Sequence, residues 1–184
     1  DLWTFSGDFS ISTWVNFTST SGSRAIASHY FQTGQRDWYI QYSSGSLNFG
    51  LSTTCTTDGS SVSTAWTPDI NKWYHLAITR TGSTVYMYIN GSLTSTATIS
   101  GASCNATQEL AIGAMEGTGP VWQDFFSGYI DEFGISGTTL SASQIRHMYE
   151  TGYRALQSHG TTLGGGAADS NQQLGFISTG TNTV

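Results

Sequence analysis

The chain has 184 residues, including 22 glycines, 26 serines and 27 threonines, and its formal charge of −6 arises from 12 acidic and 6 basic side chains. A single lysine, Lys72, and five scattered arginines exclude a nucleic-acid binder, because such proteins need clustered cations to replace phosphate counterions. No run of about twenty apolar residues occurs, so no membrane span is predicted.

Alternating apolar residues predict strands in the first third of the chain. In residues 8–17 one face is mostly apolar and Trp14 lies on the other, a pattern typical of a strand between a core and a covered surface. Further strands are predicted at residues 25–31, 37–42 and 47–51, separated by Gly and Ser that favour turns. The residues that share the first face are Phe9, Ile11, Thr13, Val15 and Phe17.

Residues 71–99 predict an antiparallel meander. Two alternating runs on either side of Thr81-Gly82 are typical of paired strands. Asn90-Gly91 then supplies the positive φ angles of a type I′ turn, so a third strand is expected from Leu93 toward Ile99. With the high Ser and Thr content, this pattern favours an all-β fold.

The remaining predicted elements are strands at residues 110–114 and 125–136 and one short helix after Leu140. Ser141 is the expected N-cap, Gln144 completes a capping box, and Leu140 and Ile145 form a hydrophobic staple. The helix is expected to end at Gly152. Ile145, Met148 and Tyr149 would form an apolar stripe that covers an edge of the sandwich.

Six sequence blocks follow one another in a fixed order: DFSISTWVNF, NKWYHLAITR, VYMYINGSL, ELAIGA, FFSGYIDEFGIS and LSASQIRHMY. Together they resemble the laminin-G-like and pentraxin-like branch of the concanavalin A-like jelly rolls. The resemblance covers about residues 1–152 and implies two stacked antiparallel sheets, some twelve strands and a late short helix. It departs at the front, where residues 2–5 alone can supply the family's extra first strand.

The acidic residues of the late strand argue against an enzyme. Glucanases of the same superfamily resemble one another in carrying three carboxylates at alternate positions of one strand. Here Asp131 and Glu132 are adjacent, so they are expected to point to opposite faces, and the positions two away are not acidic. The resemblance instead makes Asp131 a candidate calcium ligand. The alternative is that both acids bind neighbouring turns or pair with Arg80.

Two aromatic stretches are candidate sugar contacts. Sugar sites combine an aromatic floor with a few polar groups, and both stretches adjoin turns, where sandwiches tend to bind ligands. The candidate ligand-binding residues are Arg36, Asp37, Trp38 and Trp122. The alternative is that Trp38 and Trp122 pack in the core or at its rim.

Cysteines and sequons predict an extracellular, cell-surface or virion-surface location. Cys55 and Cys104 would pair in a secreted protein and stay free thiols in a cytosolic one. Acceptor triplets for glycans begin at Asn16, Asn90 and Asn105, although chance produces such triplets in a chain rich in Ser and Thr. The chain begins at Asp1 rather than at methionine, which we interpret as a processed protein or an excised segment.

The domain organisation is predicted to be a sandwich over residues 1–152 followed by a Gly/Ser/Thr-rich tail over residues 153–184. The tail is either a linker or, through residues 173–178, a strand donated to a sheet edge of the same or a neighbouring copy.

Three functions remain open on the sequence alone. The first is a non-catalytic, lectin-like recognition or adhesion module that binds a glycan or a cell-surface partner. The second is a structural subunit of an extracellular assembly, such as a virion decoration, tail fibre or surface filament. The third is a hydrolase, which the missing alternate carboxylates disfavour.

Overall fold

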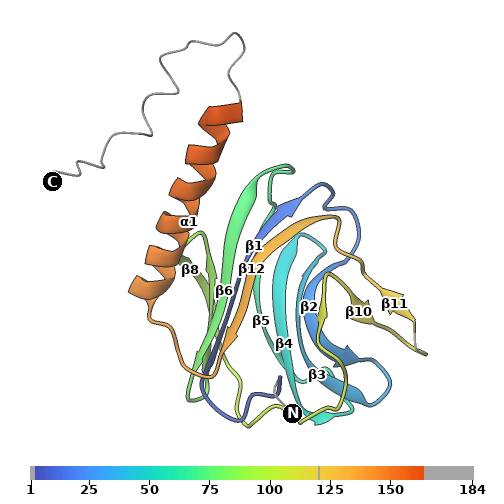
Figure 1. Cartoon of the computed structure of the whole chain (residues 1–184). Coiled ribbons are helices and arrows are strands. Elements are labelled where there is room, and N and C mark those ends of the chain that lie inside the picture. Colours follow the sequence, from blue (N-terminus) through green and yellow to red (C-terminus); the bar gives the residue numbers. More distant parts are fainter. Residues whose placement is uncertain (1–2, 120, 164–184) are drawn as a thin grey trace, which may run out of the picture. The chain divides into compact units, whose positions relative to one another are not determined.

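Two sheets packed face to face form the fold (Figure 1). The computed structural model describes residues 3–119 and 121–163, with side chains up to residue 155. The five-stranded sheet has the order β12-β1-β6-β7-β8, and the seven-stranded sheet has the order β11-β10-β2-β3-β4-β5 with β9 paired to β2. The pairs are antiparallel except for β10 with β2, so the predicted two-sheet jelly-roll sandwich is confirmed.

The strands follow most of the predicted segments closely. Their bounds are β1 (Phe9–Phe17), β2 (Arg24–Phe31), β3 (Gln35–Ser43), β4 (Ser46–Cys55), β5 (Ser60–Ala65), β6 (Trp73–Thr81), β7 (Thr84–Ile89), β8 (Ser92–Thr98), β9 (Ala111–Ile112), β10 (Met115–Glu116), β11 (Trp122–Gln123) and β12 (Gly128–Ser136). The predictions missed β5, whose sequence SSVSTA has one buried apolar residue, Val62, to reveal its inward face.

The core lies between the two sheets. The apolar face of β1 contributes four fully buried side chains, as its alternation predicts, and Trp38 and Phe49 oppose them from the other sheet. Within the described residues ahead of β1, which begin at Trp3, no further strand is formed. Instead, Phe5 is buried against the core and exchanges hydrogen bonds with Ser103. The four residues of β1 are Phe9, Ile11, Val15 and Phe17.

Helix α1 (Ala142–Leu163) begins where the capping box predicts. The Gln144 amide N–H donates to Ser141 Oγ at 3.3 Å, and the Ser141 amide N–H donates to Gln144 Oε1 at 2.8 Å. The predicted end at Gly152 is wrong, because the helix continues through Gly152 to Leu163. A single glycine inside a helix costs only about 1 kcal/mol, which the neighbouring turns offset.

The first two turns of α1 cover a face of the five-stranded sheet rather than an edge, which corrects the predicted position. Ile145 is fully buried against Ala77 of β6 and Tyr88 of β7. Tyr149 stacks on Trp14 of β1, with ring centroids 5.9 Å apart. The outer face of this sheet is therefore closed where the helix lies, which explains why Trp14 is 4% exposed.

A bulge in β12 changes where the two acids point. Between the pairs Ser12–Gly134 and Trp14–Asp131, β1 advances two residues and β12 advances three, and Glu132 has φ of 49°. Ile130 and Phe133 both pack on the core, so Asp131 and Glu132 both lie exposed on the other side. The expectation that these carboxylates point to opposite faces is wrong, because simple alternation does not hold across a bulge.

His75 of β6 is buried beneath Trp14, with ring centroids 5.3 Å apart, and its Nδ1 atom has no hydrogen-bond partner. Burial lowers the pKa of this imidazole from 6.5 to about 4. The unfolded chain therefore binds a proton between these two pH values while the folded chain does not. The contribution of neutral His75 to the free energy of unfolding is fully present above pH 6.5 and is lost as the pH falls toward 4.

We expect acidification from pH 7 to pH 4 to remove about 3 kcal/mol of unfolding free energy through His75. Urea unfolding of the wild type and of His75→Gln at several pH values isolates this contribution, because other titrating groups are common to both proteins. The difference between them should change across the interval from pH 6.5 to pH 4. A constant difference would contradict the burial argument.

The chain divides into two units, the first ending at Tyr149 and the second beginning at Glu150. Within the described part of the chain, no helix has the length and hydropathy that a membrane span requires. The segment predicted to donate a strand, residues 173–178, lies outside the described residues.

Candidate functional site

The outward side of the seven-stranded sheet combines tyrosines with hydrogen-bonding side chains. We call it the outer face of β2–β5. The register across these strands sets its rows: Tyr30 lies opposite Arg36, Tyr39 opposite Gly50, and Gln41 opposite Asn48. The members of the outer face of β2–β5 are Tyr30, Arg36, Tyr39, Gln41, Asn48, Gly50, Asp58, Ser61, Ser63 and Asp124.

Tyr39 and Gly50 form the centre of this face. A Cβ atom at position 50 would lie 2.4 Å from Tyr39 Cε1, so only glycine allows the tyrosine ring to lie flat across β4. Tyr39 is half-buried, and its ring meets Tyr30 edge to face, with centroids 5.6 Å apart. The Tyr39 ring over Gly50 therefore forms an aromatic surface on β3, which we call the tyrosine floor.

One end of the face carries a charged corner. The Tyr30 hydroxyl donates to Asp58 Oδ1 at 2.5 Å, and Arg36 Nη1 donates to the same oxygen at 3.1 Å. Burial, followed by the hydrogen bond to Asp58, raises the pKa of Tyr30. Burial and the charge of Asp58 also raise the pKa of Tyr39. Both tyrosines therefore remain protonated donors at physiological pH.

The other end of the face carries amides, hydroxyls and a carboxylate. Gln41 Nε2 donates to Asp124 Oδ2 at 2.7 Å, and Ser63 Oγ donates to Asn48 Oδ1 at 2.8 Å. The Asp124 backbone, at φ of 53°, accepts the amide hydrogen of Ala25 at 2.7 Å, which fixes the loop before β12 against β2. These polar groups flank the tyrosine floor on rigid strands.

Two predicted ligand residues, Asp37 and Trp38, point away from this face. Between the pairs His29–Trp38 and Tyr30–Arg36, β2 advances one residue and β3 advances two, so a bulge turns both side chains inward. They are 1% and 0% exposed, respectively. Their assignment as ligand contacts is therefore wrong, whereas Arg36 does lie on the outer face.

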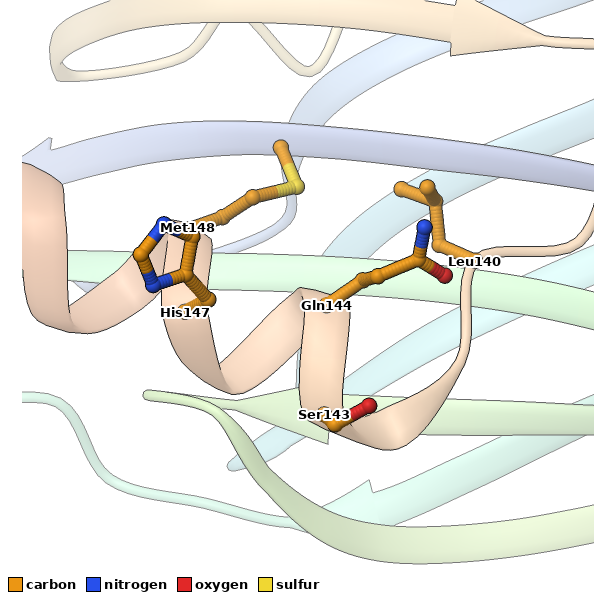
Figure 2. A pocket seen from close by; sticks show the side chains of 5 residues that line it. All are labelled: Leu140, Ser143, Gln144, His147 and Met148. Atoms are coloured by element: carbon orange, nitrogen blue, oxygen red, sulfur yellow. The ribbon is translucent and has the colours of Figure 1, made fainter.

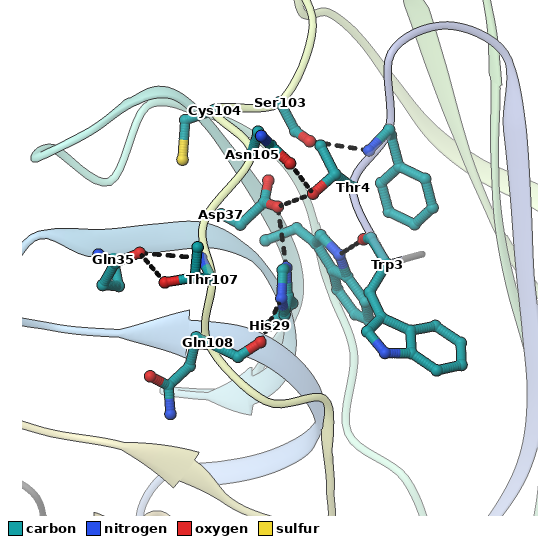
Figure 3. A network of polar contacts seen from close by, with 12 residues as sticks. Trp3, Thr4, His29, Gln35, Asp37, Ser103, Cys104, Asn105, Thr107 and Gln108 are labelled. Carbon is teal, nitrogen blue, oxygen red and sulfur yellow. Dashed lines mark hydrogen bonds and ion pairs between the residues drawn. The ribbon is translucent and has the colours of Figure 1, made fainter. Parts of the chain in front are cut away.

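Asp37 belongs to a buried network that holds the loop after Ser100 (Figure 3). Its Oδ2 atom lies 2.9 Å from His29 Nδ1 and accepts from Thr4 Oγ1 at 3.2 Å. His29 Nε2 donates to the Gln108 carbonyl at 2.6 Å. Asp37 and the Gln108 carbonyl thus bind both ring nitrogens of His29, Nδ1 and Nε2. The histidine is therefore not placed to activate a nucleophile, and the network is structural.

The structure joins Cys55 and Cys104 in a disulfide, with Cα atoms 5.3 Å apart. Of the three sequon asparagines, Asn105 is exposed in the same loop. Asn90 is half-buried, and its Oδ1 atom accepts from the His75 amide at 3.0 Å. Asn16 is 8% exposed within β1, so its burial argues against a glycan at that position.

The donor set at Asp131 does not fit a closed calcium site. Asp131 Oδ1 accepts the Glu132 amide at 2.8 Å, and its carbonyl accepts Thr13 Oγ1 at 3.0 Å. Across the described ranges, no three Asp, Glu, His or Cys side chains are grouped to hold a metal. Calcium requires six to eight oxygens. Calcium at Asp131 therefore remains a prediction from the family resemblance.

Two further surface features lie outside the outer face of β2–β5 as defined above. Trp122, 39% exposed, pairs with Glu116 at the β11 edge of the seven-stranded sheet. An open hollow of about 370 Å³ adjoins α1, and Figure 2 shows the side chains that line it. The residues that line it are Leu140, Ser143, Gln144, His147 and Met148. The hollow lacks an aromatic floor.

Sequence reasoning missed most of the outer face. Its residues come from four strands and two loops, and β5 was not predicted. One local signal was available. Tyr39 and Gln41 are two residues apart, as are Asn48 and Gly50, so each pair lies on one side of its strand and together they place polar and small residues there.

Comparisons with known proteins agree with the fold. The sequence matches the laminin G family of the concanavalin A-like lectin/glucanases superfamily over residues 1–146. No curated protein sequence matches the chain. Among solved structures, the botulinum neurotoxin serotype C1 binding domain has a TM-score of 0.58 and 22% identity, with 80% of this chain and 37% of that chain covered.

Two other structures give a similar result. The native heptameric SAP-like pentraxin from Limulus polyphemus has a TM-score of 0.57 at 18% identity, covering 79% of this chain and 72% of the pentraxin. The botulinum neurotoxin type G receptor binding domain has a TM-score of 0.52 at 20% identity, covering 79% and 38%. The matched region thus spans little more than a third of each toxin domain.

Proposed function

Because the chain belongs to the laminin G family of the concanavalin A-like lectin/glucanases superfamily, we propose that its sandwich is a non-catalytic, extracellular recognition domain that binds glycans on the outer face of β2–β5. The observation that carries this proposal is the tyrosine floor made by Tyr39 over Gly50. Polar groups at both ends of that floor are the groups that would orient sugar hydroxyls.

The proposed face has the features that a sugar needs. An aromatic ring packs against the apolar side of a sugar ring, and nearby amides, hydroxyls and carboxylates bind the hydroxyl groups. Ser61 and Ser63 on β5 are exposed and small, so they leave the tyrosine accessible from that side. The disulfide and the exposed sequon at Asn105 support an extracellular location.

A non-catalytic role is supported by the placement of the acidic side chains. Asp58 and Asp124 lie at opposite ends of the outer face, where each is bonded to a neighbouring side chain. Asp131 and Glu132 are exposed on the other sheet. β12 carries only two carboxylates, at adjacent positions, so the superfamily's glycosidase pattern of three carboxylates at alternate positions of one strand is absent from it.

We expect Tyr39→Ala to weaken glycan binding about tenfold or more, because an aromatic anchor at the centre of a site typically contributes over 1 kcal/mol. Gly50→Ala should act similarly, since its methyl group displaces the Tyr39 ring. The measurement is a broad glycan array followed by titration calorimetry on the best ligand. Thermal unfolding of each variant checks that the fold is retained.

The matched control is Tyr129→Ala. Tyr129 is 64% exposed on β12 of the other sheet, so its removal should leave binding unchanged. If the wild type bound no glycan on the array, a glycan-binding function would be contradicted. If Tyr39→Ala and Tyr129→Ala lost binding equally, the assignment of the site to the outer face of β2–β5 would be contradicted. Reading the array with and without EDTA also tests calcium, and Asp131→Asn should reproduce any effect of the chelator.

A further inference from the structure

We infer that the outer face of β2–β5 selects uncharged glycans and disfavours those that carry sialic acid, uronate or sulfate. This inference rests on the proposed function and adds the chemical class of the ligand. It follows from the balance of charges around Tyr39, which is negative.

Two carboxylates border the tyrosine floor. The Asp58 side chain is 61% exposed, so its negative charge reaches solvent beside the site. Asp124 accepts a hydrogen bond from the neutral Gln41 amide. Among the ion pairs of the described residues, none involves Asp124. An acidic sugar group approaching this end would therefore meet an uncompensated like charge.

One cation lies on the face, and its charge is already matched. Arg36 Nη1 binds Asp58, Nε donates to the Gln32 carbonyl at 2.8 Å, and the guanidinium lies 6.0 Å from the centroid of the Tyr30 ring. These contacts fix the guanidinium against Tyr30 and Asp58. An acidic ligand that recruited Arg36 would have to compete with an existing carboxylate.

The other cations of the first unit lie elsewhere. Lys72 binds Asp69 at 2.7 Å before β6, and Arg80 is buried, with donors to the Gly82 and Gly101 carbonyls. Arg146 lies on α1. Arg24 lies opposite Tyr42, on the side of β2 that faces the core. Recognition of a sugar carboxylate or sulfate typically uses a free arginine or lysine. The described outer face does not offer one.

The remaining polar groups of the face are neutral. Gln41, Asn48, Ser61 and Ser63 provide amide and hydroxyl groups that can both donate and accept hydrogen bonds. This mixture matches sugar hydroxyls, which also donate and accept. The face is thus complementary to a neutral sugar in hydrogen bonding and in charge.

The test is a glycan array with matched neutral and acidic forms of each structure, in which terminal galactose is compared with its sialylated and sulfated derivatives. We expect neutral forms to bind about tenfold more tightly, as like charges near a partly desolvated site produce. Asp124→Asn, which keeps an acceptor for Gln41, should reduce that ratio about threefold. Higher salt should reduce it too.

The control variant is Glu132→Gln, which removes a charge from the other sheet and should leave the ratio unchanged. Tighter binding of acidic forms by the wild type, or a ratio that Asp124→Asn does not change, would overturn the inference while leaving glycan recognition intact. A wild type that binds neither form contradicts the proposed function itself, and the inference with it.

Discussion

Reduction of the Cys55–Cys104 disulfide is expected to lower the free energy of unfolding by about 4 kcal/mol. The two cysteines are 49 residues apart, so the bond closes a long loop in the unfolded chain and removes much of its conformational freedom. The folded chain keeps the same loop in place by other contacts, among them the Cys104 amide bonded to the Ser52 carbonyl at 3.0 Å. The loss therefore arises mainly from the unfolded state.

Urea unfolding with and without a reductant measures this contribution. The double variant Cys55→Ser/Cys104→Ser is the control, because its stability should match that of the reduced wild type and should not respond to the reductant. Equal midpoints for the oxidised and reduced wild type would contradict the prediction.

Replacement of Trp38 by alanine is expected to lower the unfolding free energy by about 3 to 5 kcal/mol. The side chain is completely buried, packs against Phe5 with centroids 5.4 Å apart, and donates from Nε1 to the Trp3 carbonyl at 2.7 Å. Alanine would leave a cavity and an unpaired carbonyl. The urea midpoint measures the loss.

Trp122→Ala is the matched control for Trp38→Ala. Its side chain is 39% exposed, so we expect a change in stability within about 0.5 kcal/mol. The pair of variants also separates packing from recognition, because both tryptophans were candidate sugar contacts. Unchanged stability of Trp38→Ala together with lost glycan binding would restore Trp38 as a ligand residue.

Sequence patterns predicted those parts of the fold that depend on local periodicity. The alternation in residues 9–17 placed four side chains in the core, and the Ser141–Gln144 capping box located the start of α1. Asn90-Gly91 predicted its turn for a steric reason, and both residues have positive φ. These features need only the chemistry of neighbouring residues.

The strand side chains that were assigned to the wrong face share one physical cause. Both bulges, at Asp37 in β3 and at Glu132 in β12, insert one residue into the two-residue period of a strand, and each changes which side chains reach the surface. A bulge is set by pairing with a strand that is distant in sequence. Periodicity within one segment therefore could not reveal that Asp37 and Trp38 are buried or that Asp131 and Glu132 are both exposed.

The site was equally hard to predict, because its parts meet only in the folded sheet. Asp124 and Gln41 are 83 residues apart, and Asp58 reaches Tyr30 from 28 residues away. Arg36 was predicted as a ligand residue and lies on the outer face of β2–β5, yet its partner Asp58 lies in a loop beside a strand that the sequence did not predict.

The acidic bulge of β12 also bears on how the protein behaves at high concentration. β12 is the last strand of its sheet, and such a strand offers a row of backbone N–H and C=O groups to which a strand of another molecule can add. The left-handed turn at Glu132 interrupts that row, and two like charges beside it repel an identical strand from a second molecule. The bulge and its two charges are thus features that disfavour edge-to-edge pairing of β12 with a second copy.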